Sequence, residues 1–112
     1  VFMILFLAVI LIVLVVVCAK KIKLSQNEKN IIGTWKNSNS ENVITVQDSD
    51  TLILYNDIPE AGLYHGNASY HFSYTDTICV TQDDISAEFC VDVDENQLII
   101  YFAGQVYLVL QK

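Results

Sequence analysis

The first nineteen residues of the chain contain no charged side chain and nothing more polar than Cys18. Three lysines, Lys20, Lys21 and Lys23, follow at once. In an α-helix, nineteen residues rise roughly 28 Å, close to the ~30 Å hydrocarbon core of a bilayer. A buried helix of a water-soluble protein normally has one polar face, whereas this segment is apolar on every side. The sequence therefore predicts a membrane span over residues 1–19.

A cleaved signal peptide is the alternative to a retained span. Signal peptides have an apolar core of about 7–15 residues and a small residue at the cleavage site. Here the apolar run is longer, and Val-Val-Val stands directly before Cys18. A bacterial lipoprotein would also need a small residue before its lipidated cysteine. We therefore expect the segment to be retained as an anchor.

Positive charge predicts the orientation of this anchor. Cytoplasmic flanks of membrane spans carry an excess of lysine and arginine, and Lys20, Lys21 and Lys23 all follow the span. Residues 20–112 are therefore expected on the cytoplasmic side, with these three lysines contacting lipid headgroups. On that side the sequon at Asn67 would carry no glycan, because glycans are attached in the lumen.

The rest of the chain is strongly acidic. Residues 24–112 hold three lysines against all thirteen acidic residues, a net charge of about −10, and the chain has no arginine. Nucleic-acid binding is excluded on this basis, because phosphate contacts need clustered cations. An acidic domain suits a basic protein partner, although a merely solvated acidic surface explains the same composition.

Two segments follow the predicted span. Residues 20–30 are polar and without periodicity, which predicts a juxtamembrane linker or a helical continuation of the span. Residues 31–112 form one small domain with a single core. In this domain, short runs of β-branched and aromatic residues alternate with turn-forming residues. The expected strands are residues 31–35, 43–46, 51–55, 68–74, 77–81, 86–93, 98–102 and 105–110.

The predicted fold is an N-terminal transmembrane helix followed by a small all-β domain. Seven or eight short strands at regular spacing indicate an antiparallel barrel or sandwich. Ala103-Gly104 predicts a tight hairpin between the last two strands. The side chains expected to point inward from these two strands are Leu98, Ile100, Phe102, Val106, Leu108 and Leu110.

Tyr101 and Tyr107 alternate with that inward set and are expected to point outward. Tyrosines are enriched at protein interfaces, because an apolar ring and a polar tip suit a surface that becomes buried on binding. These two residues are therefore candidate partner contacts.

Cys79 and Cys90 form a candidate disulfide. Both strands that contain them alternate apolar and polar residues, and pairing Cys79 with Cys90 also places Val80 opposite Phe89 in the core. Directly opposed residues have Cβ atoms about 4.5–5.5 Å apart, so a disulfide would need only a small adjustment. A cytoplasmic location favours two free thiols instead. The sequence leaves both states open.

Patterns for catalysis and cofactor binding are missing from the sequence. The chain has no glycine-rich phosphate loop, no Gly-x-Ser-x-Gly and no histidine or cysteine pair at a metal-ligand spacing. The segment from Asp92 starts like a calcium loop, but Gln97 stands where glycine is needed and Ala103 where glutamate is needed. We therefore predict a non-enzymatic protein without a cofactor or a small-molecule substrate, and a hairpin turn at residues 94–96.

Gly33-Thr34-Trp35 resembles the Gly-x-Trp motif of lipocalins. In that family the tryptophan closes one end of an eight-stranded barrel and usually has an arginine packed on it. The resemblance implies that Trp35 is buried at one end of a barrel. It also implies an alternative function, a membrane-tethered module that binds a small apolar ligand.

The layout of the whole chain resembles small membrane-anchored proteins of large icosahedral DNA viruses. It combines a single span, a short lysine-rich linker, Gly33-Thr34-Trp35 and a closing strand over residues 106–112. In such viruses an internal membrane lies under the capsid, and small anchored proteins join the two. The resemblance implies a virion inner-membrane or minor capsid protein that docks on a neighbouring capsid protein, with a viral source of thiol oxidation for the two strand cysteines. A bacterial envelope protein with an inhibitor-like β-domain is a third option.

Overall fold

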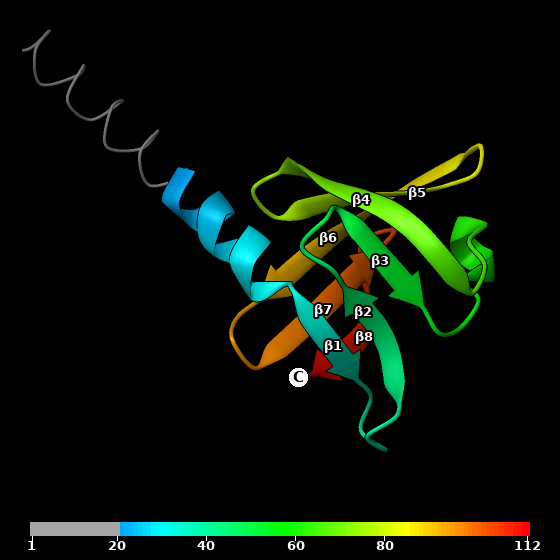
Figure 1. The fold of residues 1–112 in the computed structure, drawn as a ribbon, viewed down its shortest axis with the longest axis horizontal. Coiled ribbons are helices and arrows are strands. Elements are labelled where there is room, and N and C mark those ends of the chain that lie inside the picture. The colour runs from blue at the N-terminus through cyan, green and yellow to red at the C-terminus, as the bar shows by residue number, and fades with distance from the viewer. Residues whose placement is uncertain (1–20) are drawn as a thin grey trace, which may run out of the picture.

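The computed structural model describes residues 21–112, which form a short helix followed by a closed antiparallel β-barrel (Figure 1). The predicted transmembrane helix, residues 1–19, and Lys20 lie outside the described residues. Within residues 21–112, no helix is both long and apolar enough to cross a membrane. The closed barrel confirms the predicted all-β fold of residues 31–112, as a barrel and not as a sandwich.

Eight strands form the barrel, and each pairs with its neighbours in chain order. All eight lie where the sequence predicts a strand, with ends that differ by about two residues or fewer. They are β1 (Gly33–Lys36), β2 (Asn42–Val46), β3 (Thr51–Leu54), β4 (Gly66–Tyr74), β5 (Thr77–Gln82), β6 (Ile85–Val93), β7 (Gln97–Phe102) and β8 (Gln105–Gln111), with a 3-10 helix, η1 (Pro59–Ala61), between β3 and β4.

The tight turns follow the chemistry of their residues. Ala103 and Gly104 both have positive φ, 53° and 79°, as a two-residue hairpin that matches the strand twist requires. This turn pairs Phe102 with Gln105 and confirms the predicted hairpin. The predicted turn at residues 94–96 is also present, because β6 ends at Val93 and β7 begins at Gln97.

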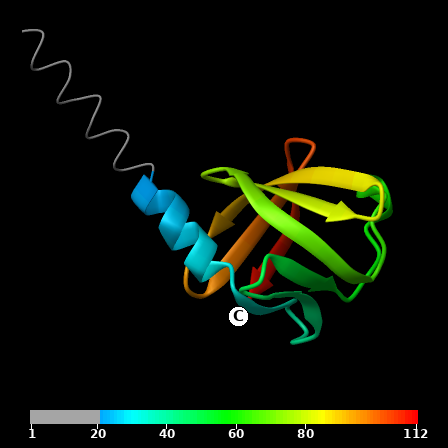
Figure 2. The same ribbon diagram turned by 45° about the horizontal axis from the view of Figure 1, so that its top comes forward.

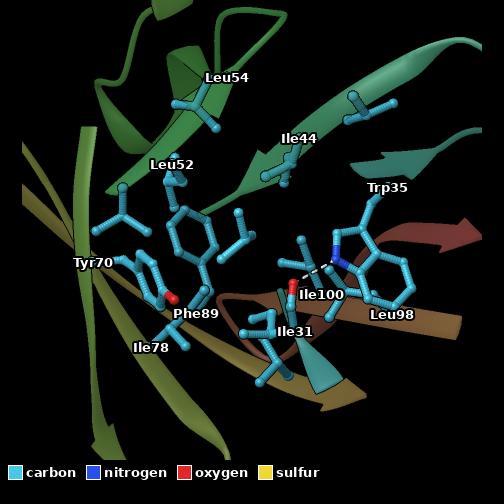
Figure 3. Close-up of a cluster of buried hydrophobic side chains, with 14 of the residues drawn as sticks. Ile31, Trp35, Ile44, Leu52, Leu54, Tyr70, Ile78, Phe89, Leu98 and Ile100 are labelled. Carbon is cyan, nitrogen blue, oxygen red and sulfur yellow. Dashed lines mark hydrogen bonds between the residues drawn. The ribbon is translucent and has the colours of Figure 1, made fainter. Parts of the chain in front are cut away.

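The core lies inside the barrel and takes side chains from all eight strands, and Figure 3 shows part of it. Alternate residues of β6 are buried, as its apolar periodicity predicts: Ala87, Phe89, Val91 and Val93. Trp35 is 0% exposed and lies beside Ile31 and Leu98 in the core (Figure 3), and Ile31 directly follows the helix. Burial of Trp35 is therefore confirmed.

A helix, rather than an irregular linker, leads into the barrel: residues 21–30 are helical (Figure 2). Asn27 is 2% exposed, and its Nδ2 donates a 2.8 Å hydrogen bond to the carbonyl oxygen of Thr75 in the β4–β5 turn. The Ile31 amide donates to the Asn27 carbonyl at 3.0 Å, and Trp35 Nε1 donates to the Ile31 carbonyl at 2.8 Å. These bonds fix the helix to one end of the barrel.

The predicted register of β5 against β6 is wrong by two residues. Cys79 lies opposite Glu88, and Cys90 lies opposite Thr77. A shift of two residues keeps every side chain on its predicted face, so alternation cannot detect it. The two-residue turn at Asp83-Asp84 decides the register, because it pairs Gln82 with Ile85.

The predicted orientation of two residues in β8 is also wrong. Ile100 pairs with Leu108 but Tyr101 pairs with Val106, so Tyr107 is an extra residue in a β-bulge. As a result Val106 is 59% exposed, while Tyr107 packs against the core. The strict alternation expected along this strand stops at the bulge.

Candidate functional site

The interior of the barrel has little free space. Its cavity measures about 30 Å³ and is lined by apolar side chains and by the rings of Tyr70 and Tyr107. That volume is close to the share of one water molecule in the liquid, whereas ligand pockets span roughly 300–1,000 Å³. The interior therefore has no room for the small apolar ligand of the lipocalin-like alternative.

Two open grooves flank the helix where it meets the barrel. One, of about 540 Å³, lies between the helix, the β2–β3 turn and β4, and it is bordered by Glu28, Lys29, Asp48, Asp50 and Tyr70. Burial, followed by the charges of Asp50, Glu28 and Asp48, raises the pKa of Tyr70. Its hydroxyl donates to the Gln47 carbonyl at 3.3 Å. This groove is polar and carries charges of both signs.

The second groove, of about 320 Å³, lies on the other side of the helix. Lys23, Asn27, Cys90, Asp92 and Tyr101 border it. The polar groups of this groove come from four separate elements: the helix, the β4–β5 turn, β6 and β7. No cluster of three His, Cys, Asp or Glu side chains able to hold a metal ion occurs among residues 21–112.

The acidic residues are concentrated at the ends of the barrel. Of the thirteen, only Glu88 and Asp92 lie on strands, and both are on β6. The β2–β3, β4–β5 and β6–β7 turns share the end that holds the helix (Figure 2). These three turns carry Asp48, Asp50, Asp76, Asp94 and Glu95.

The outer face of β7 and β8 has a different character. Ile99, Tyr101, Val106 and Val109 lie on it as two cross-strand pairs, Tyr101 with Val106 and Ile99 with Val109. Val106 and Val109 are 59% and 49% exposed. No charged residue occurs from Gln97 to Gln111. We call these four side chains the apolar wall.

The candidate partner contacts Tyr101 and Tyr107 do not share a surface. Tyr101 is half-buried and belongs to the apolar wall. The Tyr107 hydroxyl donates a 3.0 Å hydrogen bond to Glu60 Oε2 in η1. Burial and this hydrogen bond raise the pKa of Tyr107. Tyr107 therefore braces η1 against β8, with its ring packed against the core.

The other predicted site residues lie at the surface. Lys21 and Lys23 are exposed on the helix, whereas Lys20 lies outside the described residues. Cys79 and Cys90 are free thiols on the outer faces of β5 and β6. Cys90 Sγ lies 3.9 Å from the Thr77 hydroxyl. The register that would bring the two sulfurs directly opposite each other is not present.

A histidine–carboxylate pair braces the β3–β4 connection. His65 Nδ1 lies 2.6 Å from Asp57 Oδ1, and the His65 amide donates to the same oxygen at 2.9 Å. The backbone bond, then the side-chain bond, lower the pKa of Asp57. Both side chains are exposed, and no third polar group joins them. The pair has the geometry of a loop brace.

The comparisons with known proteins add no relative. No family model matches the chain, and no curated protein or solved structure matches it.

The apolar wall is the surface that the sequence interpretation missed. Counting alternation through β8 without a bulge assigned Val106 to the core and left Ile99 and Val109 without a role. The available signal was the run of fifteen uncharged residues from Gln97 to Gln111 in a domain of net charge about −10.

Proposed function

We propose that this chain is a non-enzymatic, membrane-anchored interaction protein whose barrel is held at the membrane surface by the helix of residues 21–30. The nineteen-residue uncharged run at residues 1–19 carries this proposal. Segments of that length and apolarity are typical of transmembrane helices. In this proposal the barrel is a domain on the cytoplasmic side that binds another protein.

The junction between helix and barrel supports a defined attachment. Asn27 and Ile31, 2% and 1% exposed, lie at the contact of the helix with the barrel. A helix fixed in this way holds the barrel at a set position relative to the anchor. A flexible linker would let the barrel move. The exposed Lys21 and Lys23 are the part of the helix suited to anionic headgroups.

The acidic turns at the helix end of the barrel favour a position in which the barrel does not touch the lipid. These turns carry five acidic side chains toward the end where the chain meets the membrane. An anionic leaflet repels them while it attracts the lysines of the helix. The helix then lies at the lipid surface and the barrel lies beyond it.

The nearly filled interior argues against the alternative of a lipocalin-like ligand carrier. A cavity of about 30 Å³ holds no drug-sized or lipid-like molecule. Recognition by such a barrel must use its outer surface. A surface that binds another protein is therefore the better-supported function.

The finer proposal places the chain in a virion, as an inner-membrane or minor capsid protein that links the membrane to the capsid shell. The support is the resemblance in layout to small anchored proteins of large icosahedral DNA viruses. Mass spectrometry of purified particles tests it, with cross-linking to identify a capsid neighbour of the barrel. Absence of the chain from the particles would remove this part of the proposal and leave the anchoring intact.

A membrane-extraction experiment on the full chain tests the anchoring. Leu11→Asp with Val13→Asp should release the protein into the alkaline-soluble fraction, since each charge near the centre of a span costs about 2.5–3.5 kcal/mol on insertion scales. Leu11→Ala with Val13→Ala is the matched control and should stay in the membrane pellet. A soluble fragment that lacks residues 1–19 in the unmutated protein would overturn the proposal.

Glycosylation tests the orientation. Asn67 is exposed on β4, and we expect no glycan on it in cells that glycosylate proteins in the lumen. Glu41→Thr creates a second sequon at Asn39, in the exposed β1–β2 turn, and this sequon should also stay unmodified. A glycosidase-sensitive mass shift at either position would reverse the orientation.

A further inference from the structure

A buried hydrogen-bond acceptor without a partner borders the groove of about 320 Å³ beside the helix. Asn27 lines this groove and is 2% exposed. Its Nδ2 donates to the Thr75 carbonyl at 2.8 Å, whereas its Oδ1 has no hydrogen-bond partner within residues 21–112. Unpaired buried polar atoms are uncommon in native proteins, because they lose water and gain nothing in return. We call this groove the Asn27 groove.

The Asn27 amide has a fixed orientation. The group next to the Thr75 carbonyl must be the NH₂, because an oxygen accepts hydrogen bonds and does not donate them. Rotating the amide by half a turn would bring two oxygens together and leave both unpaired. The unpaired atom is therefore the oxygen, and the group that completes this site is a hydrogen-bond donor.

Two carboxylates border the same groove. Asp76 lies in the β4–β5 turn, directly after the residue that binds Asn27, and Asp92 lies on β6. Alternation places Asp92 on the same outer face of β6 as Cys90, which pairs with Tyr101 of β7. The Tyr101 ring also lines the groove. The Asn27 groove therefore combines three acceptor groups, from three elements, with one aromatic ring.

The one lysine at the border of the groove leaves these acceptors free. Lys23 lies one helical turn before Asn27 and is exposed. It forms no ion pair within residues 21–112. Asp76 and Asp92 are exposed as well. Both carboxylates are therefore available to a cation from outside the chain.

A primary ammonium group matches this set of acceptors. It is compact, carries one positive charge and three donors, and has no acceptor of its own. One donor serves the Asn27 oxygen, and two remain for the carboxylates. A metal ion fits less well, because no cluster of three metal-binding side chains occurs in the part of the chain that the structure describes.

The depth of the Asn27 oxygen indicates what carries the ammonium. The oxygen is buried, so the ammonium must extend into the groove on a narrow stem. A lysine side chain has four methylenes that can pack on an aromatic ring while its charged end reaches further. An ethanolamine lipid headgroup has only two carbons in its stem. We infer that the Asn27 groove binds the ammonium group of a lysine from a protein partner, with the lysine methylenes packed on the Tyr101 ring.

The charge of the domain agrees with a basic partner. Residues 24–112 have a net charge of about −10, which attracts a surface rich in lysine over distances longer than a hydrogen bond. The inference rests on the proposed function and deepens it, since it names the group by which a protein partner is held. The site itself does not depend on the membrane anchor.

Nuclear magnetic resonance of the full chain in maltoside micelles tests the site. The probe is the peptide acetyl-Gly-Lys-Gly-amide, and its Nε-acetylated form is the matched neutral control. Titration with the lysine peptide should shift the side-chain NH₂ signal of Asn27 and the ring signals of Tyr101. The acetylated peptide should shift neither, because acetylation removes the charge and two of the three donors. Equal shifts with both peptides, or no shift with either, would overturn the inference.

Matched variants separate this site from a general attraction of cations to an acidic domain. Asp92→Asn should weaken binding of the lysine peptide about fivefold, because it removes a carboxylate of the groove. Glu88→Gln is the control, since it removes the same charge from the same strand at an exposed position outside the groove. It should change the affinity less than about twofold. Equal effects of the two variants would assign the binding to net charge and remove the site.

A lipid amine is tested as the other source of the ammonium. In bicelles of phosphatidylcholine, addition of phosphatidylethanolamine should leave the Asn27 and Tyr101 signals unchanged. Shifts that match those of the lysine peptide would assign the groove to a lipid headgroup and overturn the protein partner.

Failure of anchoring can be separated from failure of this site. Flotation of the full chain with vesicles reports on the anchoring alone. A chain that does not float, but whose Asn27 signal shifts with the lysine peptide, would retain the site and lose the anchoring. A chain that floats and shows no shift would retain the anchoring and lose the site.

Discussion

The barrel is closed in two different ways on its two sides. On one side β4, β5 and β6 are joined by long ladders, and every residue of β5 pairs with a residue of β6. On the other side the ring closes through one residue pair, Lys36 of β1 with Gln111 of β8. We call the first the ladder side and the second the seam.

Side chains replace backbone hydrogen bonds at the seam. Trp35 is fully buried and donates from its indole nitrogen to the Ile31 carbonyl at 2.8 Å. Lys112 Nζ lies 5.1 Å from the centre of the Trp35 ring and donates to the Asn30 carbonyl at 3.0 Å. These contacts join the end of the helix, β1 and the residue after β8. The comparison indicates that a barrel can close with few ladder bonds where a large buried ring joins its first and last strands.

The largest effect should follow from removing that ring. Trp35→Ala should cost about 3–5 kcal/mol, because it leaves a large cavity at the point where the ladder is weakest. Loss of that size can unfold a domain of about 80 residues. Far-UV circular dichroism during denaturation measures it, because the chain has one tryptophan and the variant loses its own fluorescence probe.

Trp35→Phe is the matched control for the same position. It keeps an aromatic ring but loses the indole hydrogen bond, so it should cost less than Trp35→Ala. Amide exchange should then increase in β1 and β8 before it changes in β5. Equal acceleration on the ladder side would contradict the idea that the two sides open separately.

A smaller loss should follow from Gly33→Ala, which also acts at the seam. Gly33 has a φ of +138°, and a Cβ there would lie 2.5 Å from Lys112 Cε. Backbone strain of this kind costs on the order of 1–3 kcal/mol. Gly66→Ala is the matched control, since Gly66 has a φ of +124° but no atom within 4 Å of the added Cβ.

A double-mutant cycle separates strain from collision at this position. If the Lys112 side chain is part of the cost, Gly33→Ala should be less harmful in a Lys112→Ala background. The midpoint of urea unfolding measures each variant. Additive effects in the cycle would show that the lysine moves aside and that backbone strain alone is responsible.

Local features of the barrel could be predicted from the sequence, whereas the pairing of its strands could not. Strand positions and the Ala103-Gly104 turn follow from local composition, and the burial of Trp35 was implied by the Gly33-Thr34-Trp35 motif. The register of β5 against β6 does not, because a shift of two residues preserves both faces. The deciding signal was the Asp83-Asp84 turn, where Asp83 has a φ of 53° and the chain reverses in two residues.

Contacts between distant parts of the chain were beyond local patterns. Asn27 bonds to Thr75, 48 positions away, so no periodicity in residues 20–30 could show that this segment is fixed to the barrel. The bulge at Tyr107 likewise depends on how β8 meets β7. It moved Val106 out of the core and created the apolar wall. This surface was therefore less predictable than the fold.

Removing the Lys112 ammonium group from the Trp35 ring should lower the free energy of unfolding moderately. Lys112→Ala removes the contact with the Trp35 ring and the hydrogen bond to Asn30, and we expect about 1 kcal/mol of destabilisation. An arginine guanidinium can also lie over an aromatic ring and donate to a carbonyl oxygen, so Lys112→Arg should retain most of the stability. Lys36→Ala, exposed on β1, is the control, and an equal loss there would indicate a general charge effect instead.

The smallest effect should come from an exposed turn that joins β6 of the ladder side to β7. Asp94 Oδ1 accepts hydrogen bonds from the Asn96 and Gln97 amides, both at 2.8 Å. These two bonds, with a smaller contribution from the charge of Lys23, lower the pKa of Asp94 below its ordinary value of 3.8. A carboxyl whose pKa is lowered by folding stabilises the folded state above its unfolded pKa. That contribution is lost as the pH falls through the folded pKa.

The unfolding midpoint of the wild type should therefore decrease slightly more than that of Asp94→Asn when the pH falls from about 6 to about 2. Identical pH profiles for the two proteins would mean that the turn is held by its backbone alone, and a midpoint that rises on acidification would contradict the assigned direction.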